Sequence, residues 1–166
     1  LAQIDALVAA LRPFPKLRVL FTSSTGVYPD DGHTWAEDSL PPDAHSPNPL
    51  LAAEGRIAAL PNSHILRLGG LWGAGREPAR YFAGKQDLEA GLAPVNLTHQ
   101  QEALQALDLM LNHPAPPRVL NVVSPATYTR QDWYTARCQA LGLPLPTFRP
   151  ETLPGKRVNP ALWVAL

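Results

Sequence analysis

The chain alternates between segments with helical spacing of apolar residues and short, mostly apolar runs, and this alternation restricts its fold most strongly. The helical spacing covers four longer segments and one shorter one, at residues 1–11, 49–60, 99–112, 130–141 and 78–85. The apolar runs are Val19–Phe21, Ile65–Leu68 and Val119–Val123. Such runs are typical of strands buried on both faces of a parallel sheet. We therefore expect an α/β domain with a largely parallel sheet.

Residues suited to helix ends mark where several of these helices begin or stop. Asn48, followed directly by proline, predicts an N-cap with proline at the first helical position. Thr98 and Gln101 have the spacing of a capping box, and Thr129 has an acidic residue three positions later. Gly142 predicts the end of the last of these helices.

Charge and cysteine content exclude several classes of partner. The 14 lysines and arginines balance the 14 acidic residues, and no basic run occurs, so we expect no nucleic-acid partner. No apolar run approaches the roughly 20 residues of a spanning helix, so we expect no membrane partner. The balanced charge favours a small molecule or another protein as partner. The single cysteine, Cys138, cannot form an internal disulfide, which favours a reducing, cytoplasmic location.

Two loops are candidates for function. The segment 28–48 is long for a connection inside a compact domain, and such loops tend to be functional. The segment 69–75 contains four glycines and predicts a loop whose backbone approaches a ligand closely.

Three groups of residues occur in an order that resembles a known family. The segment Phe21-Thr-Ser-Ser-Thr-Gly-Val-Tyr28, then Glu37-Asp38, then Leu51-Ala-Ala-Glu54 resembles the central part of extended short-chain dehydrogenase/reductases of the epimerase/dehydratase type. Further segments resemble an atypical bacterial subgroup described as NAD(P)-dependent epimerase/dehydratase-like, at residues 65–76, 80–85, 95–99 and 141–144. The resemblance spans nearly the whole chain.

This resemblance implies a doubly wound Rossmann-type parallel sheet with a small substrate-binding lobe. In the family the first βα turn carries a Gly-x-x-Gly-x-x-Gly loop that holds the pyrophosphate of NAD or NADP. The glycines at 69–75 follow a late strand and lack that spacing. We therefore expect residues 1–166 to be a single partial domain, the C-terminal part of the sheet, with the dinucleotide-binding N-terminal part absent. The missing initiator methionine, with a helix already under way at Leu1, leads to the same expectation.

The resemblance also implies a catalytic serine at the end of the first strand, assisted by a tyrosine and lysine in a Tyr-x-x-x-Lys pair. Ser24 matches the serine, with Thr25 as an alternative hydroxyl. The segment that should carry the pair reads Ser46-Pro-Asn-Pro-Leu50, and no tyrosine occurs between residues 28 and 81, nor any lysine between residues 16 and 85. A tyrosine needs a nearby cation to act as a base near neutral pH, so the standard redox route is in doubt.

Further candidate contacts are inferred from the same resemblance. Cofactor contacts are expected from Ser23, Gly70 and Leu71. Substrate contacts are expected from Tyr28, Arg76, Arg80, Lys85, Asn96 and His99. Several of these residues also have a purely structural interpretation. The hydroxyls at 23–25 could end the strand by bonding the backbone, and Tyr28 could pack in the core. The basic residues could be solvated charges on a surface helix, and His99 could be a structural histidine at a helix start. Tyr81 and Lys85 have the Tyr-x-x-x-Lys spacing, but Gly84 weakens any helix that would align them.

Three functional hypotheses follow. The first is an NAD(P)-dependent epimerase/dehydratase-like enzyme acting on a nucleotide-sugar-like or other carbonyl/alcohol substrate, with the chain alone inactive. The second is a non-catalytic NAD(P)-binding sensor or regulator. The third, a serine hydrolase at Ser24, is disfavoured because Thr22 replaces the first glycine of Gly-x-Ser-x-Gly. The five histidines lack metal-ligand spacing, so we expect no metal site. The strand at Val19 is expected to have an unpaired edge, which could allow a homodimer to form.

Overall fold

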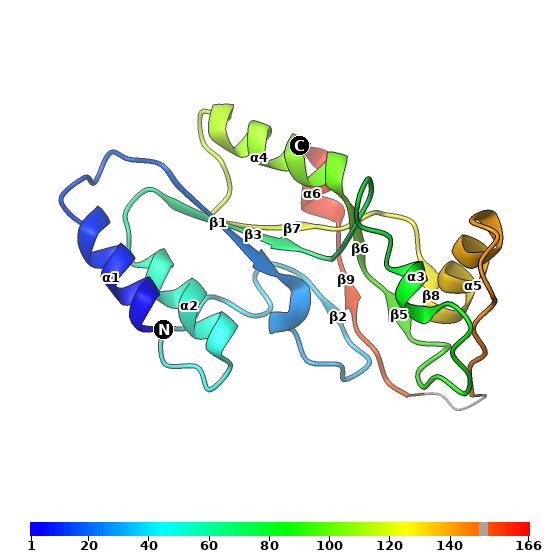
Figure 1. The fold of residues 1–166 in the computed structure, drawn as a ribbon. Coiled ribbons are helices and arrows are strands. Elements are labelled where there is room, and N and C mark those ends of the chain that lie inside the picture. The colour runs from blue at the N-terminus through cyan, green and yellow to red at the C-terminus, as the bar shows by residue number, and fades with distance from the viewer. Residues whose placement is uncertain (150–152) are drawn as a thin grey trace.

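The computed structural model, which describes residues 1–149 and 153–166, is organised around a three-stranded parallel sheet (Figure 1). Its strands are β1 (Val19–Ser24), β3 (Ser63–Leu68) and β7 (Val119–Val122), in the order β1-β3-β7. All pairings are parallel, so the predicted α/β class with a parallel sheet is confirmed. The strands end at the same edge of the sheet, where ligands lie in open α/β folds.

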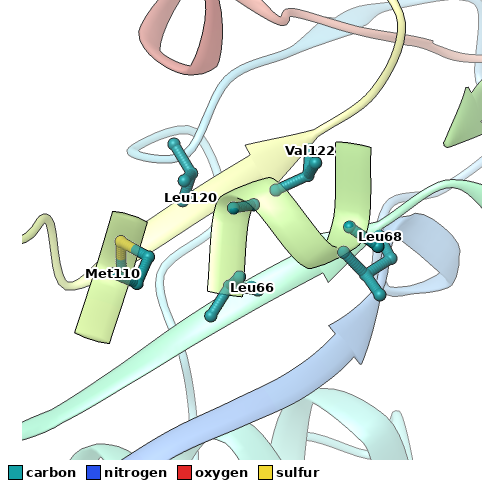
Figure 2. Packing of buried hydrophobic residues seen from close by; sticks show 7 residues of the cluster. Leu66, Leu68, Met110, Leu120 and Val122 are labelled. Atoms are coloured by element: carbon teal, nitrogen blue, oxygen red, sulfur yellow. The ribbon is translucent and has the colours of Figure 1, made fainter. Parts of the chain in front are cut away.

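Helices cover both faces of this sheet (Figure 1). On one face lie α1 (Ala2–Leu11) and α2 (Pro49–Ala58), whose buried Val8 and Ile57 pack against Val19 and Phe21 of β1. On the other face lies α4 (Gln100–Asn112). Figure 2 shows this second core, where the leucines and valine of β3 and β7 pack around the methionine of α4: Leu66, Leu68, Leu120, Val122 and Met110. Alternate strand residues serve opposite faces, so each strand of this sheet has side chains packed on both sides.

The predicted helix starts are confirmed in two cases and wrong by one residue in the third. The Asn48 side chain accepts from the backbone amides of residues 50 and 51, and Thr129 caps α5 (Arg130–Ala140). The cap of α4 is His99 with Glu102, and the predicted pair of Thr98 and Gln101 is wrong. The reason is that Thr98 is buried in β6 (Leu97–His99), where its hydroxyl donates to the carbonyl of Val122.

The glycine-dense segment after β3 is partly a strand rather than the predicted loop. Residues of β4 (Gly70–Trp72) pair in parallel with β6. Gly69 is required at this crossing, because a Cβ there would lie 2.7 Å from the carbonyl oxygen of Asn96. Two more short pairs escaped the sequence pattern, which cannot register strands of two residues: β2 (Thr34–Trp35) with β9 (Arg157–Val158), and β5 (Pro94–Val95) with β8 (Tyr128–Thr129).

A small lobe lies at the end of the molecule away from α1 and α2 (Figure 1). It consists of α3 (Ala79–Phe82), α5, β5 and β8, and its core joins Ala79, Tyr134 and Cys138. The last helix, α6 (Ala161–Ala165), returns to the sheet beside β7. Within the described residues no helix is both long and apolar enough to cross a membrane.

Candidate functional site

Two hydroxyl residues stand at the carboxyl end of β1. Ser24 is the last residue of this strand and caps the short 3-10 helix η1 (Thr25–Val27), its Oγ accepting from the amide of Gly26 at 3.0 Å. Ser24 is partly exposed, whereas Thr25 is buried. The sequence therefore placed this pair correctly at the sheet edge where ligands bind in the fold class.

Ser23, the predicted cofactor contact beside them, is occupied inside the protein. Its Oγ donates to Oε1 of Glu54 at 2.6 Å. The same carboxylate receives Arg67, with 2.6 Å between Nη2 and Oε2 and with Nε also donating to the carboxylate. Both charged side chains have no exposed surface. The ion pair fixes α2 against β1 and β3, and it was not predicted from the sequence.

Tyr28 belongs to the same buried network. Its hydroxyl accepts from Nη1 of Arg67 at 2.7 Å and lies 2.9 Å from Oδ1 of Asn121, and its ring stacks on Trp35. Burial raises the pKa of the Tyr28 hydroxyl, although the charge and hydrogen bond of Arg67 act in the opposite direction. The hydroxyl therefore stays protonated near neutral pH. Of the two alternatives for this residue, the structure shows core packing, and Tyr28 does not replace the absent catalytic tyrosine.

The positions of the missing Tyr-x-x-x-Lys pair carry no acid–base group. Ser46 precedes α2 and accepts from the amide of Asn48 at 3.2 Å. Leu50, where the family has lysine, packs into an apolar cluster with Val27 and Val123. At the position where the family has a lysine, this helix therefore has an apolar side chain that packs next to η1.

A cation reaches this region from the far end of the chain. Nζ of Lys156 donates to the carbonyl oxygen of Tyr28 at 2.6 Å and lies 3.4 Å from Asp30. The predicted substrate contact Asn96 holds the same segment, since its side chain donates to the carbonyl of Lys156 and accepts from the amide of Val158, each at 2.9 Å. Sequence reasoning missed Lys156 because its partners lie more than a hundred positions away.

The predicted contacts Gly70 and Leu71 lie on β4. The amide of Gly70 donates to the carbonyl oxygen of Asn96 at 2.8 Å, which joins β4 to the residue between β5 and β6. Leu71 packs against the core beneath α4. The structure thus brings Gly70 and Asn96 together, while Ser24 lies on a different strand.

The basic residues predicted as substrate contacts are exposed on the small lobe. Arg76 and Arg80 line one open pocket of about 350 Å³, and Nε of Arg76 donates to the carbonyl of Leu71. Lys85 places Nζ 3.6 Å from the centre of the Tyr81 ring, so it contacts the ring face. The helix α3 ends at Phe82, before the glycine at position 84, which has a φ of +69°. The pair is a cation–π contact and does not reproduce the family dyad.

His99 makes two contacts that stabilise the start of α4. Its Nδ1 accepts from the amide of Gln101 at 3.2 Å, which caps α4, and its ring packs on Trp72 with 4.6 Å between centroids. Both contacts explain a histidine at this helix start without catalysis.

A cavity that the sequence did not reveal lies between the small lobe and the sheet. It has a volume of about 440 Å³. About half of its lining belongs to α5, and the rest comes from β4, β5, β6, β8 and the segment after β7; the residues with polar or aromatic side chains are Trp72, Ser124, Tyr128, Asp132, Trp133 and Arg137. A second cavity of about 170 Å³ shares Val95, Ser124 and Tyr128 with it and reaches Arg157 of β9. Two tryptophans thus form part of the wall of this cavity.

Comparison with known proteins identifies relatives of this architecture. No family model matches the chain. Protein YeeZ of Escherichia coli strain K12 is 39% identical over 145 residues, which cover 84% of this chain and 52% of YeeZ. The chain therefore spans about half the length of the curated relative it matches.

Solved structures give the same picture at the level of the fold. A putative NAD-dependent epimerase/dehydratase from Methylobacillus flagellatus superposes with a TM-score of 0.75 at 27% identity, covering 95% of this chain and 60% of that one. A functionally unknown conserved protein from Silicibacter pomeroyi superposes with a TM-score of 0.74 at 27% identity, covering 96% of this chain and 63% of that one. A UDP-glucuronic acid 4-epimerase from Bacillus cereus, in complex with NAD, superposes with a TM-score of 0.76 at 16% identity, covering 98% of this chain and 59% of that one. At this identity the likeness shows the fold alone. The chain thus has the Rossmann-like fold of NAD-dependent epimerase/dehydratase proteins, and its resemblance to extended short-chain dehydrogenase/reductases is confirmed.

Proposed function

We propose that this chain is the C-terminal part of an NAD(P)-dependent epimerase/dehydratase-like protein that acts on a nucleotide-sugar-like or other carbonyl/alcohol substrate. The observation that carries the proposal is Ser24, a partly exposed hydroxyl at the carboxyl end of a parallel strand in this fold. The NAD in the related Bacillus cereus epimerase supports a nicotinamide cofactor. In the proposal, a glycine-rich turn outside residues 1–166 binds the dinucleotide.

The chemistry within this proposal begins with a hydrogen bond from Ser24. Its oxygen already accepts from the amide of Gly26, so the hydroxyl hydrogen can be donated to a substrate oxygen. Donation to an oxygen that gains negative charge stabilises the transition state. Thr25 offers a second hydroxyl one residue later.

The second candidate is a non-catalytic cofactor sensor, and one observation favours it. Leu50 occupies the lysine position inside an apolar cluster, and the pKa of Tyr28, the tyrosine nearest to Ser24 in sequence, is raised by burial. A site that lacks its proton-transfer group can keep cofactor binding while losing turnover.

Hydride transfer by the product of the complete reading frame separates the two functions. The enzyme hypothesis predicts a change in NAD(P)H absorbance with a carbonyl or nucleotide-sugar substrate, and a loss of about 100-fold in kcat for Ser24→Ala. A matched control, Thr22→Ala, alters an exposed β1 hydroxyl and should leave kcat unchanged. The sensor hypothesis predicts saturable NAD(P) binding with no turnover. Failure to bind either cofactor would overturn both.

The remaining contacts complete the proposal. In the proposal, the exposed side chains of Arg76, Arg80 and Lys85 contact a phosphate group of the substrate, and Gly70 and Leu71 contact the cofactor. A homodimer through the edge of β1 and a cytoplasmic location belong to the same proposal.

A further inference from the structure

The 440 Å³ cavity between α5 and β4 has no role in the function proposed above. Ser24 is not among its lining residues, and the cavity lies where α5, β5 and β8 of the small lobe meet β4, β6 and the segment after β7. Its size suits a ligand of one or two rings, since ligand pockets start near 300 Å³. The cavity is therefore a candidate site for a second ligand.

The helix α5 creates this space by placing small residues on the face that meets the cavity. Its lining residues recur with helical spacing at Asp132, Trp133, Ala136, Arg137 and Ala140. The opposite face carries Tyr134 and Cys138, which are buried against α3. Because the large side chains serve the lobe core, the alanines at 136 and 140 leave the volume open without loosening the fold.

Aromatic rings form the apolar part of the wall. Trp72 and Trp133 meet edge to face with 5.7 Å between their centroids, and Tyr128, 50% exposed, stands at the rim. Aromatic walls favour flat rings and, through their electron-rich faces, cations.

The charges of the wall do not cancel. Arg137 is neutralised by Glu77, with 2.7 Å between Nη2 and Oε2, and its guanidinium lies 5.1 Å from the centre of the Trp72 ring. The Asp132 carboxylate accepts from the hydroxyl of Thr129 at 2.6 Å. Among residues 1–149 and 153–166, no ion pair involves Asp132. The lining thus includes one exposed acidic side chain, in the first turn of α5, that has no ion-pair partner among the described residues.

We propose that this cavity binds a small aromatic compound carrying a cationic amino group, with the ring packed against the wall that Trp72 and Trp133 form and the ammonium on Asp132. The proposal is independent of the dinucleotide chemistry at Ser24, so either can fail without the other.

Three probes with the same ring test it. Phenethylamine, 2-phenylethanol and 3-phenylpropanoate are titrated into the product of the complete reading frame by calorimetry, with tryptophan emission as a second readout. The amine should bind about tenfold or more tightly than the alcohol and the acid, as a charge-assisted hydrogen bond requires. Equal affinities for the three probes, or no binding of the amine up to about 10 mM, would overturn the proposal.

Two pairs of variants separate the wall from the fold. Asp132→Asn keeps an acceptor for Thr129 and should reduce the amine's affinity to that of the alcohol, whereas Asp108→Asn on α4 should not. Ala136→Leu fills the cavity and should abolish binding, whereas Gln139→Leu, on an exposed position of α5 outside the lining, should not. If Asp132→Asn keeps the preference for the amine, the assignment is wrong.

Discussion

The buried ion pair of Arg67 and Glu54 offers the sharpest test of how this fold is held together. Arg67 donates three hydrogen bonds to the carboxylate of Glu54, one to the hydroxyl of Tyr28 and one to the carbonyl of Leu40. Burial alone would lower the pKa of the Arg67 guanidinium, but the hydrogen bonds and charge of Glu54 raise it above its ordinary value. The pair is therefore charged, and each member depends on the other.

Replacing Arg67 with methionine keeps most of the volume and leaves the Glu54 carboxylate buried with only the Ser23 hydroxyl from this network. Breaking a buried pair in this way costs about 3–5 kcal/mol, a large part of the roughly 5–15 kcal/mol that stabilises a typical domain. For a chain of this size the midpoint of thermal unfolding should fall by about 6–20 °C. Urea denaturation followed by circular dichroism measures the change directly.

The matched comparisons distinguish a buried charge from a lost contact. Arg67→Met combined with Glu54→Leu should recover most of the stability, because no unpaired charge remains. Asp5→Ala breaks the surface pair with Arg56, in which Asp5 is 55% exposed, and should cost about 1 kcal/mol or less. The reasoning is refuted if Arg67→Met lies within about 1 kcal/mol of the wild type, or if the double variant is no more stable than Arg67→Met.

Three further outcomes follow from the structure. Because the folded-state pKa of Tyr28 is raised, its contribution is complete below about pH 10 and is lost as pH rises through the folded value, so wild-type stability should fall more steeply than that of Tyr28→Phe in alkaline urea titrations. Cys138 is fully buried and burial raises its pKa, so a thiol reagent should label it only after denaturation; rapid native labelling would contradict its placement. Thr22→Lys adds charge to the exposed residue of β1, so it should reduce any self-association of the 1–166 chain seen by light scattering, and unchanged association would exclude this edge as the interface.

The longer helices and strands were predictable from the sequence, and the two-residue strands were not. Asn48 with the following proline fixed the start of α2, and the apolar runs at 19, 65 and 119 located the three parallel strands. Two-residue strands such as β2 and β5 depend on partners far along the chain, so no local pattern marks them. The shift from Thr98 to His99 as the cap of α4 has the same origin, because Val122 takes the threonine hydroxyl into the sheet.

The candidate site was predictable in position more than in contacts. The sequence alone predicts that the hydroxyl of Ser24 lies at the end of a strand. It also shows that positions 46 and 50 lack the tyrosine and lysine of the family. Ser23 and Tyr28 looked equally available, yet Glu54 and Arg67 bind them inside the protein. A buried charge inside an apolar strand, as at Arg67, was the one local signal that such a network existed, because a charge is buried only when it is paired.

A crystal structure of the complete reading-frame product with NAD⁺ tests the central claim most directly. The account predicts a dinucleotide across the carboxyl ends of the parallel strands, with its nicotinamide ring beside the Ser24 hydroxyl. A dinucleotide bound elsewhere, or a Ser24 side chain directed away from the nicotinamide, would contradict it.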